Sequence, residues 1–422
     1  MDNIVSWTVE DEAIIATNTD ATECKRCAVE LGYWKDDYIK YFAKHVDRKA
    51  PEINRGYYAR VKAMEMFIHQ FLERCDTKCQ IINLGCGFDT LYWRLKDTTQ
   101  AVANFIELDF PTVVRKKYQI IKRNKQLLEK ICNEGATPDG LFEDGLVEIK
   151  CPFSAFGLDF EEAIRQKKLK CFKLNDRSEV ILDRNHDYGT KSKASSILLI
   201  KIIIHHQHNC IRNTNNTATR VFVDLPVNDL SIISDACADG EVVIRSGDVH
   251  AAGYHLAACD LRCEREVARQ LAACEARADA PTLLLAECVL VYLRPGAGDA
   301  LLRQLAAAFP RAALLLYEQC NLADRFGEVM LRNLHARGVS LEGAAAAGPP
   351  HAQARRALAA GWARARSWDM REVWRALPDA DRARADRLEP LDERELLQQL
   401  HAHYALTVAS RGEIFADLDL HA

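Results

Sequence analysis

The sequence predicts a doubly wound α/β fold, and one short stretch carries most of that prediction. Residues 80–84 form an apolar run that ends at the glycine pair Gly85 and Gly87. A short helical segment follows, and a second apolar run over residues 103–108 ends on Asp109. Glycines let a ligand approach backbone N–H groups, and an acid about 20 residues further on can accept both ribose hydroxyls of a nucleoside. The unit therefore predicts a parallel sheet with a nucleoside cofactor at its carboxyl edge.

The glycine turn also narrows the choice of cofactor. It lacks the third glycine of the nicotinamide enzymes, and no Lys-Ser/Thr pair follows as in a P-loop. A diphosphate has no obvious binding site here, whereas S-adenosylmethionine carries an adenosine and an amino acid but no phosphate. The glycine pair alone remains equally compatible with an ordinary strand-to-helix turn.

Composition excludes several classes of protein. The chain has 422 residues, 48% of them hydrophobic, which is enough for a sizeable core in one large domain or two. A formal net charge of −4 gives no basic field for nucleic acid or anionic membrane. The apolar run at residues 282–293 is too short to span a bilayer, and the acidic N-terminus is no secretory signal. We expect a cytoplasmic protein with free thiols.

Six blocks, in order and with consistent spacing, resemble the leucine carboxyl methyltransferase family over about residues 13–125 and 240–410: CKRCAVELGYWKDDYI, KAPEINRGYYARV, NLGCGFDTLYWRLKD, FIELDFP, LLLAECVLVYL and LYEQCNLADRFGEVM. The resemblance implies an S-adenosylmethionine-dependent methyltransferase fold with an N-terminal helical cap. It implies that the substrate is the C-terminal leucine carboxylate of the protein phosphatase 2A catalytic subunit, methylated by a monomer without metal. A close relative in the family modifies a tRNA base instead, but carries a long repeat domain that we do not find here.

The resemblance also implies roles for particular residues. Arg60, the candidate catalytic residue, would position the substrate carboxylate or the carboxylate of the cofactor, with Lys25 beside it; the alternative is that both are surface cations. The other implied cofactor contacts are Gly85 for the methionine part, Asp109 for the ribose, Asp260 and Leu261 for the adenine, and Glu287 for the amino-acid end. Independently of the family, Glu287 ends a fully apolar strand, where a carboxylate needs a cation unless it is partly exposed.

The segment pattern divides the chain into four parts: a helical cap over residues 1–78, methyltransferase sequence over 79–136 and 240–422, and an insertion over 137–239. In the cap we expect helices over residues 28–46 and 57–75. After Asp109 we expect one helix, and after the insertion a single strand that ends at Asp260 and Leu261. Residues 349–400 read as helices, whose tryptophans Trp362, Trp368 and Trp374 we assign to the core rather than to a substrate groove.

The insertion is foreign to this pattern. Lysine is absent after Lys201, so composition changes within it. Residues 137–188 resemble the core of the YqaJ-type viral recombinase and exonuclease family, which binds divalent metal through residues that would be Asp139, Glu148 and Lys150. The match stops before the helix that completes that site. We expect a methyltransferase that keeps its activity when the insertion is removed. The alternatives are a metal-dependent nuclease and an inactive chimera.

Two further groups have metal-ligand chemistry. Cys24 and Cys27 together with Cys75 and Cys79 could supply four thiolates to zinc, but the first pair lies in a helical-looking segment. Three histidines crowd a compositionally biased tract, His205, His206 and His208. We interpret both groups as incidental.

Overall fold

The computed structural model describes residues 9–44, 47–131, 248–346, 348–392 and 394–421, and the backbone of five short strands between residues 141 and 245. Contacts divide the chain into two compact units, residues 1–131 with 242–422 and residues 132–241. In the second unit, β3 (Leu141–Phe142) pairs with β4 (Gly145–Leu146) and β5 (Phe172–Leu174) with β6 (Val180–Leu182), both antiparallel. The nuclease-like residues and the histidine tract lie outside the described residues: Asp139, Glu148, Lys150, His205, His206 and His208.

One sheet forms the centre of the first unit, in the strand order β12-β13-β11-β10-β1-β2-β9-β8-β7. Strands β9, β2, β1, β10 and β11 run parallel, whereas β13, β12, β8 and β7 pair antiparallel with their neighbours. From β1 the chain builds outward to β2 and β9, and then returns through β10 on the other side of β1. The doubly wound α/β prediction is confirmed. The strand bounds are β1 Cys79–Leu84, β2 Val102–Asp109, β7 Val243–Arg245, β8 Asp248–Ala251, β9 Tyr254–Ala258, β10 Thr282–Glu287, β11 Ala312–Gln319, β12 Arg364–Asp369 and β13 Tyr404–Arg411.

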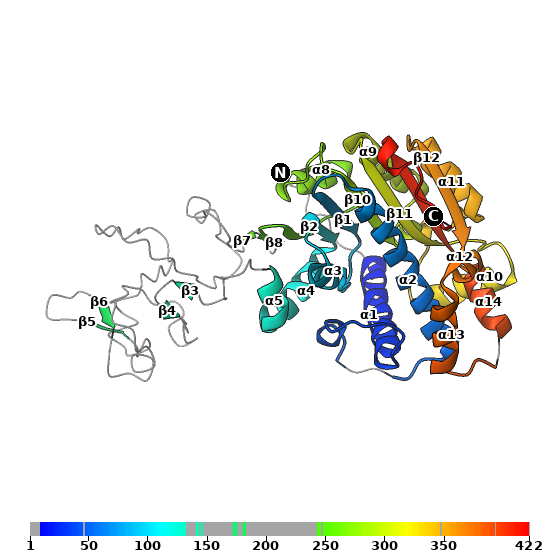
Figure 1. The fold of residues 1–422 in the computed structure, drawn as a ribbon, viewed down its shortest axis with the longest axis horizontal. Helices are drawn as coiled ribbons and strands as arrows, with labels where there is room; N and C mark the ends of the chain where they lie inside the picture. The colour runs from blue at the N-terminus through cyan, green and yellow to red at the C-terminus, as the bar shows by residue number, and fades with distance from the viewer. Residues whose placement is uncertain are drawn as a thin grey trace. The chain divides into compact units, whose positions relative to one another are not determined.

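Helices cover both faces of this sheet (Figure 1). Successive side chains of β1 point to opposite faces, so Ile81 joins the core cluster packed by α2 to α5 and Ile82 the cluster packed by α8, α9 and α11. Among the described residues, no helix is long and apolar enough to cross a bilayer. The helix bounds are α1 Val9–Glu30, α2 Pro51–Arg74, α3 Leu91–Thr98, α4 Pro111–Arg123, α5 Lys125–Ile131, α8 Glu264–Ala273, α9 Pro295–Ala308, α10 Arg325–Ala336, α11 Pro350–Ala359, α12 Met370–Ala376, α13 Asp379–Leu388 and α14 Arg394–Ala402.

The first helix of the cap lies earlier than predicted. It ends at Glu30, and the following residues to 44 hold only a short 3₁₀ turn, so the prediction of a helix over residues 28–46 is wrong for most of its length. The helix stops because Gly32 adopts a φ of +87°, and the N–H groups of Gly32 and Tyr33 return to the carbonyls of Val29 and Ala28. That is the glycine-dependent ending that satisfies the last carbonyls of a helix.

Three further elements differ from the prediction. The expected single strand before Asp260 is a meander of β7, β8 and β9, with a tight turn at Gly253 (φ +79°). The helix expected after Asp109 is broken at Asn124 into α4 and α5. Within residues 349–400, β12 is a strand, whose alternating exposed side chains show that it lies at the sheet edge. The assignment of the tryptophans to the core is confirmed: Trp362 is buried, and Trp368 and Trp374 pack against core clusters.

Candidate functional site

A cavity of about 360 Å³ lies where the order of strands reverses, at the carboxyl ends of β1 and β10. In doubly wound sheets this reversal point leaves a crevice that binds ligands. Side chains of α1 and α10 also line the cavity. All seven residues that the family resemblance assigns to the cofactor and substrate line it: Lys25 on α1, Arg60 on α2, Gly85 after β1, Asp109 at the end of β2, Asp260 and Leu261 after β9, and Glu287 at the end of β10.

The glycine turn after β1 is tightly enclosed. Gly85 and Gly87 have φ angles of +62° and +51°, which side-chain-bearing residues rarely adopt. A Cβ on Gly85 would lie 2.7 Å from Val289 Cγ2, and one on Gly87 would collide with Asn18 Oδ1. Asn18 also accepts a hydrogen bond from the Phe88 N–H at 2.8 Å, so α1 lies directly against the turn. Sequence reasoning missed Asn18, because this contact joins residues 70 positions apart.

Asp109 holds the same turn from the neighbouring strand. Its Oδ2 accepts from the Gly87 N–H at 2.6 Å and its Oδ1 from the Phe110 N–H at 2.7 Å. Burial raises the pKa of this carboxyl, against the lowering effect of those two N–H donors. A carboxylate offers about four acceptor sites, so Asp109 can hold the turn and still accept from a ligand in the cavity.

Four side chains, Lys25, Arg60, Asp89 and Glu287, form what we call the charge cluster. Arg60 Nε donates to Glu287 Oε2 at 2.5 Å, and Lys25 Nζ donates to Asp89 Oδ2 at 2.7 Å. Lys25 Nζ also lies 3.8 Å from Glu287 Oε2. The four side chains are between 10% and 16% exposed, and all four line the cavity. The expectation that Glu287 meets a cation is thus confirmed.

Charge balance sets the protonation of the cluster. Burial would raise the pKa of Glu287, but Lys25 and Arg60 outweigh burial and hold its pKa below the ordinary value. The Arg60 guanidinium also lies over the Tyr317 ring, 4.7 Å from its centre, and 5.8 Å from that of Tyr57. Cation and ring attract each other more strongly away from water, so Arg60 is held in place from two sides.

The loop between β9 and α8 carries the two residues predicted to bind adenine. Asp260 Oδ1 accepts from the Arg262 N–H at 2.9 Å and from Arg262 Nε at 2.8 Å, while Arg262 Nη1 lies 3.0 Å from Asp11 Oδ1. These bonds orient the Asp260 carboxylate next to Leu261 at the cavity wall.

Sequence reasoning also missed Gln319, the last residue of β11. It lines the cavity, and its Oε1 is buried without a hydrogen-bond partner among the described residues. A polar residue at the end of an apolar strand could have signalled this position, as it did for Glu287. The buried acceptor is suited to a donor on a bound ligand.

A second ion pair, which is buried, supports the glycine turn after β1. Lys117 and Glu107 are both fully buried, and Lys117 Nζ lies 2.7 Å from Glu107 Oε2. Tyr254 donates to the same Glu107 oxygen at 2.7 Å, and Lys117 donates to the Asp89 backbone carbonyl at 2.9 Å. We call Lys117 and Glu107 the sealed pair; Tyr254 is hydrogen-bonded to it. The sealed pair fixes the backbone that carries Asp89 into the charge cluster.

The four cysteines considered for zinc are free thiols in two pairs: Cys24 and Cys27 lie on α1, whereas Cys75 at the end of α2 contacts Cys79 at the start of β1. In the part of the chain that the structure describes, they do not gather into a group of ligand atoms within metal-binding reach.

The family model of leucine carboxyl methyltransferase matches residues 13–170 and 240–306 of this chain. The second matched segment begins at the boundary expected for the end of the insertion. The first extends past residue 137, into the segment that we expected to be foreign, so the N-terminal boundary of the insertion stays a prediction.

Whole-chain relatives point the same way. Leucine carboxyl methyltransferase 1 of Bos taurus is 31% identical over 404 residues, which cover 96% of this chain and 91% of the relative. The Caenorhabditis elegans protein of the same name is 30% identical over 406 residues, with 95% and 92% covered. Human tRNA wybutosine-synthesizing protein 4 is 29% identical over 408 residues, with 95% of this chain but 44% of the relative covered. With its fold and site, this chain belongs to the leucine carboxyl methyltransferase family.

Proposed function

We propose that this chain transfers a methyl group from S-adenosylmethionine to the C-terminal leucine carboxylate of the protein phosphatase 2A catalytic subunit. The observation that carries the proposal is the cavity at the strand reversal, which is lined by every residue that the family resemblance assigns to the cofactor. The similarity to the bovine and nematode leucine carboxyl methyltransferases supports leucine carboxyl methylation.

The charge cluster suits the amino-acid end of this cofactor. That end is a zwitterion, and the cavity offers the matching pair: Glu287 for the ammonium group, and Arg60 with Lys25 for the carboxylate. Arg60 and Glu287 bind each other in this structure. On cofactor binding, the cofactor carboxylate would replace Glu287 as the partner of Arg60, and the cofactor ammonium group would replace Arg60 as the partner of Glu287. Gly85 leaves room for the methionine part, Asp109 accepts from the ribose hydroxyls, and Asp260 with the Leu261 backbone holds the adenine.

The bound cofactor supplies an electrophilic methyl group, and the protein needs to supply little acid–base chemistry. A leucine carboxylate is already ionised at neutral pH, so no general base is required. The chain contributes alignment and removal of water. Arg60 orients the attacking carboxylate or holds that of the cofactor, and the apolar side chains Ile14, Met330 and Leu334 on α1 and α10 line a part of the cavity suited to the leucine side chain.

The alternative acceptor within the family is a tRNA base. The chain spans 91% of the bovine leucine carboxyl methyltransferase but less than half of the human tRNA-modifying relative, 44%. Its formal charge of −4 also offers no general attraction to nucleic acid. Both facts favour the protein acceptor.

A labelled-methyl assay with two peptides tests the proposal. A peptide with the sequence of the phosphatase tail, ending in leucine, should accept a base-labile methyl group, and the same peptide with a C-terminal amide should not. The folded phosphatase should be the better substrate, because a docked surface offsets the ordering of a flexible tail. Equal labelling of acid and amide would exclude carboxyl methylation.

We also propose that residues 137–239 are foreign to the methyltransferase, since residues 171–239 lie between the two segments that the family model matches, and lysine disappears from the composition within them. The same assay on a chain in which a short linker replaces residues 137–235 should give undiminished methyl transfer. Loss of transfer with a retained fold would show that the segment takes part in the reaction.

A further inference from the structure

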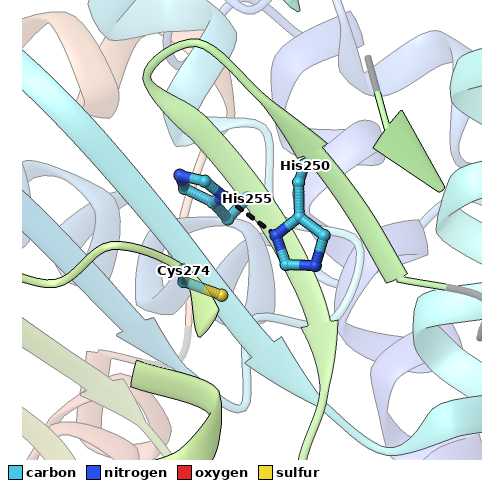
Figure 2. Close-up of side chains that lie close together, drawn as sticks. All are labelled: His250, His255 and Cys274. Carbon is cyan, nitrogen blue, oxygen red and sulfur yellow. Dashed lines mark hydrogen bonds between the residues drawn. The ribbon is translucent and has the colours of Figure 1, made fainter. Parts of the chain in front are cut away.

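Three side chains with metal-ligand chemistry converge at the other end of β9 from the Asp260 loop (Figure 2). They are His250 on β8, His255 on β9, and Cys274, which directly follows α8. The candidate ligand atoms all lie within 4.8 Å of one another. The two Nδ1 atoms are 2.9 Å apart, and the cysteine sulfur points toward the histidine pair.

Backbone structure holds these three positions together. His250 and His255 are direct partners in the antiparallel register of β8 and β9, so their side chains lie on the same face of the sheet. Cys274 is fixed by its N–H, which bonds to the Gln270 carbonyl at 2.9 Å at the end of α8. His255 is 3% exposed, Cys274 is fully buried, and His250 is half-buried. A ligand would therefore enter past His250.

We propose that His250, His255 and Cys274 bind a zinc ion. Two imidazole nitrogens and one thiolate, without a carboxylate, are the donor set of zinc and related transition ions rather than of magnesium or calcium. Zinc bonds of about 2.0 to 2.3 Å place neighbouring ligand atoms roughly 3.3 to 3.7 Å apart in a tetrahedron. The two nitrogens need to separate by only a few tenths of an ångström, and the fourth position is left to water.

This site is distinct from the methyl-transfer cavity, because none of its three residues lines that cavity. It joins the first part of β9 to the end of α8, and so closes the strand–helix unit whose connecting loop carries Asp260 and Leu261. A bound ion would therefore stabilise the adenine side of the cavity without taking part in the chemistry. The expectation that methyl transfer needs no metal is unaffected.

Cobalt(II) titration of the full-length chain, stripped with a chelator, tests the site. Cobalt replaces zinc in such donor sets, and its bond to a thiolate gives a charge-transfer absorption in the near ultraviolet. We expect this absorption to saturate at one equivalent, to disappear on addition of zinc, and to be lost in Cys274→Ser. Zinc should also raise the Tm of the wild-type chain by several degrees, but not that of Cys274→Ser.

Matched variants separate this site from other thiols and histidines. Cys263→Ser removes an exposed thiol at the start of the same helix and should leave the absorption intact. A chain with His205, His206 and His208 all changed to Ala should also keep it. If Cys274→Ser fails to fold, His250→Gln, at the half-buried position, should weaken cobalt binding at least tenfold. No absorption, absorption that persists in Cys274→Ser, or absorption lost only without the three histidines would overturn the proposal.

Discussion

The charge cluster and the sealed pair use the same kinds of side chain but differ in access. Lys117 and Glu107 are fully buried, whereas the four members of the charge cluster keep 10% to 16% of their side-chain surface exposed where they line the cavity. Lys117 also bonds to the Asp89 carbonyl, so the two groups share one stretch of backbone. The sealed pair fixes the backbone of the glycine turn, and the charge cluster presents its charges to the cavity.

This difference indicates what each group can do. No ligand reaches the sealed pair, so its contribution is to the fold, and removing one partner leaves the other charge buried alone. Ligand charges can replace protein charges in the charge cluster, because its members already face the cavity. Loss of one partner there should therefore affect binding more than stability. Single substitutions in each group test that separation.

Lys117→Met should be strongly destabilising. It removes the cation from a fully buried pair and leaves Glu107 with Tyr254 as its remaining hydrogen-bond donor. Breaking a buried pair from one side costs about 3–5 kcal/mol. Urea unfolding followed by circular dichroism measures this loss.

Lys116→Met is the matched control, because Lys116 neighbours Lys117 on the same helix but its side chain is exposed. It should change the free energy of unfolding by less than about 0.5 kcal/mol. An equally small change in Lys117→Met would mean that the sealed pair does not hold the fold.

Arg60→Met should separate binding from stability in the opposite sense. A charged hydrogen bond to the ligand contributes about 1.5–3 kcal/mol, so the Kd for S-adenosylmethionine should rise roughly 10- to 100-fold. The free energy of unfolding should fall by less than the roughly 3–5 kcal/mol expected of Lys117→Met, because the pair faces the cavity and Lys25 still lies 3.8 Å from Glu287. Calorimetric titration and urea unfolding measure the two quantities.

Lys62→Met, on the same helix but not at the cavity, should leave the Kd unchanged. A loss of stability in Arg60→Met as large as that in Lys117→Met would remove the distinction between the two groups.

Local patterns in the sequence were sufficient to predict the centre of the site. The strand, glycine turn and acid over residues 80–109 are contiguous, and a carboxylate in an apolar strand marked Glu287 without knowledge of its partner. The family resemblance supplied Lys25, Arg60, Asp260 and Leu261, and the structure brings them to the same cavity.

The elements that were missed depend on information that is not local. The end of α1 depends on one positive φ at Gly32, and β12 is an edge strand rich in arginine that resembles a helix in composition. Asn18 reaches the cavity only through tertiary packing, whereas Gln319, at the end of an apolar strand, carried the same local signal as Glu287. The pairing of His250 with His255 required the register of a hairpin that we had predicted to be one strand.

The smallest effect concerns pH and tests whether the charges of the cluster stabilise the folded state. Lys25 and Arg60 lower the folded-state pKa of Glu287 below its ordinary value of 4.5, against the effect of burial. A carboxyl whose pKa is lower in the folded state stabilises the fold above its unfolded pKa, and loses that contribution as the pH falls through the folded pKa. Glu287→Gln cannot ionise. The wild-type chain should therefore exceed this variant in stability most at pH 7, with the gap closing as the pH falls below about 4.5.

Urea unfolding of both proteins between pH 7 and pH 3.5 measures the gap, and Glu342→Gln, at a more exposed carboxylate outside the cluster, is the control. A gap that stays constant with pH would mean that Glu287 acts in the fold through its shape alone, and not through the charge that we assign to ligand binding.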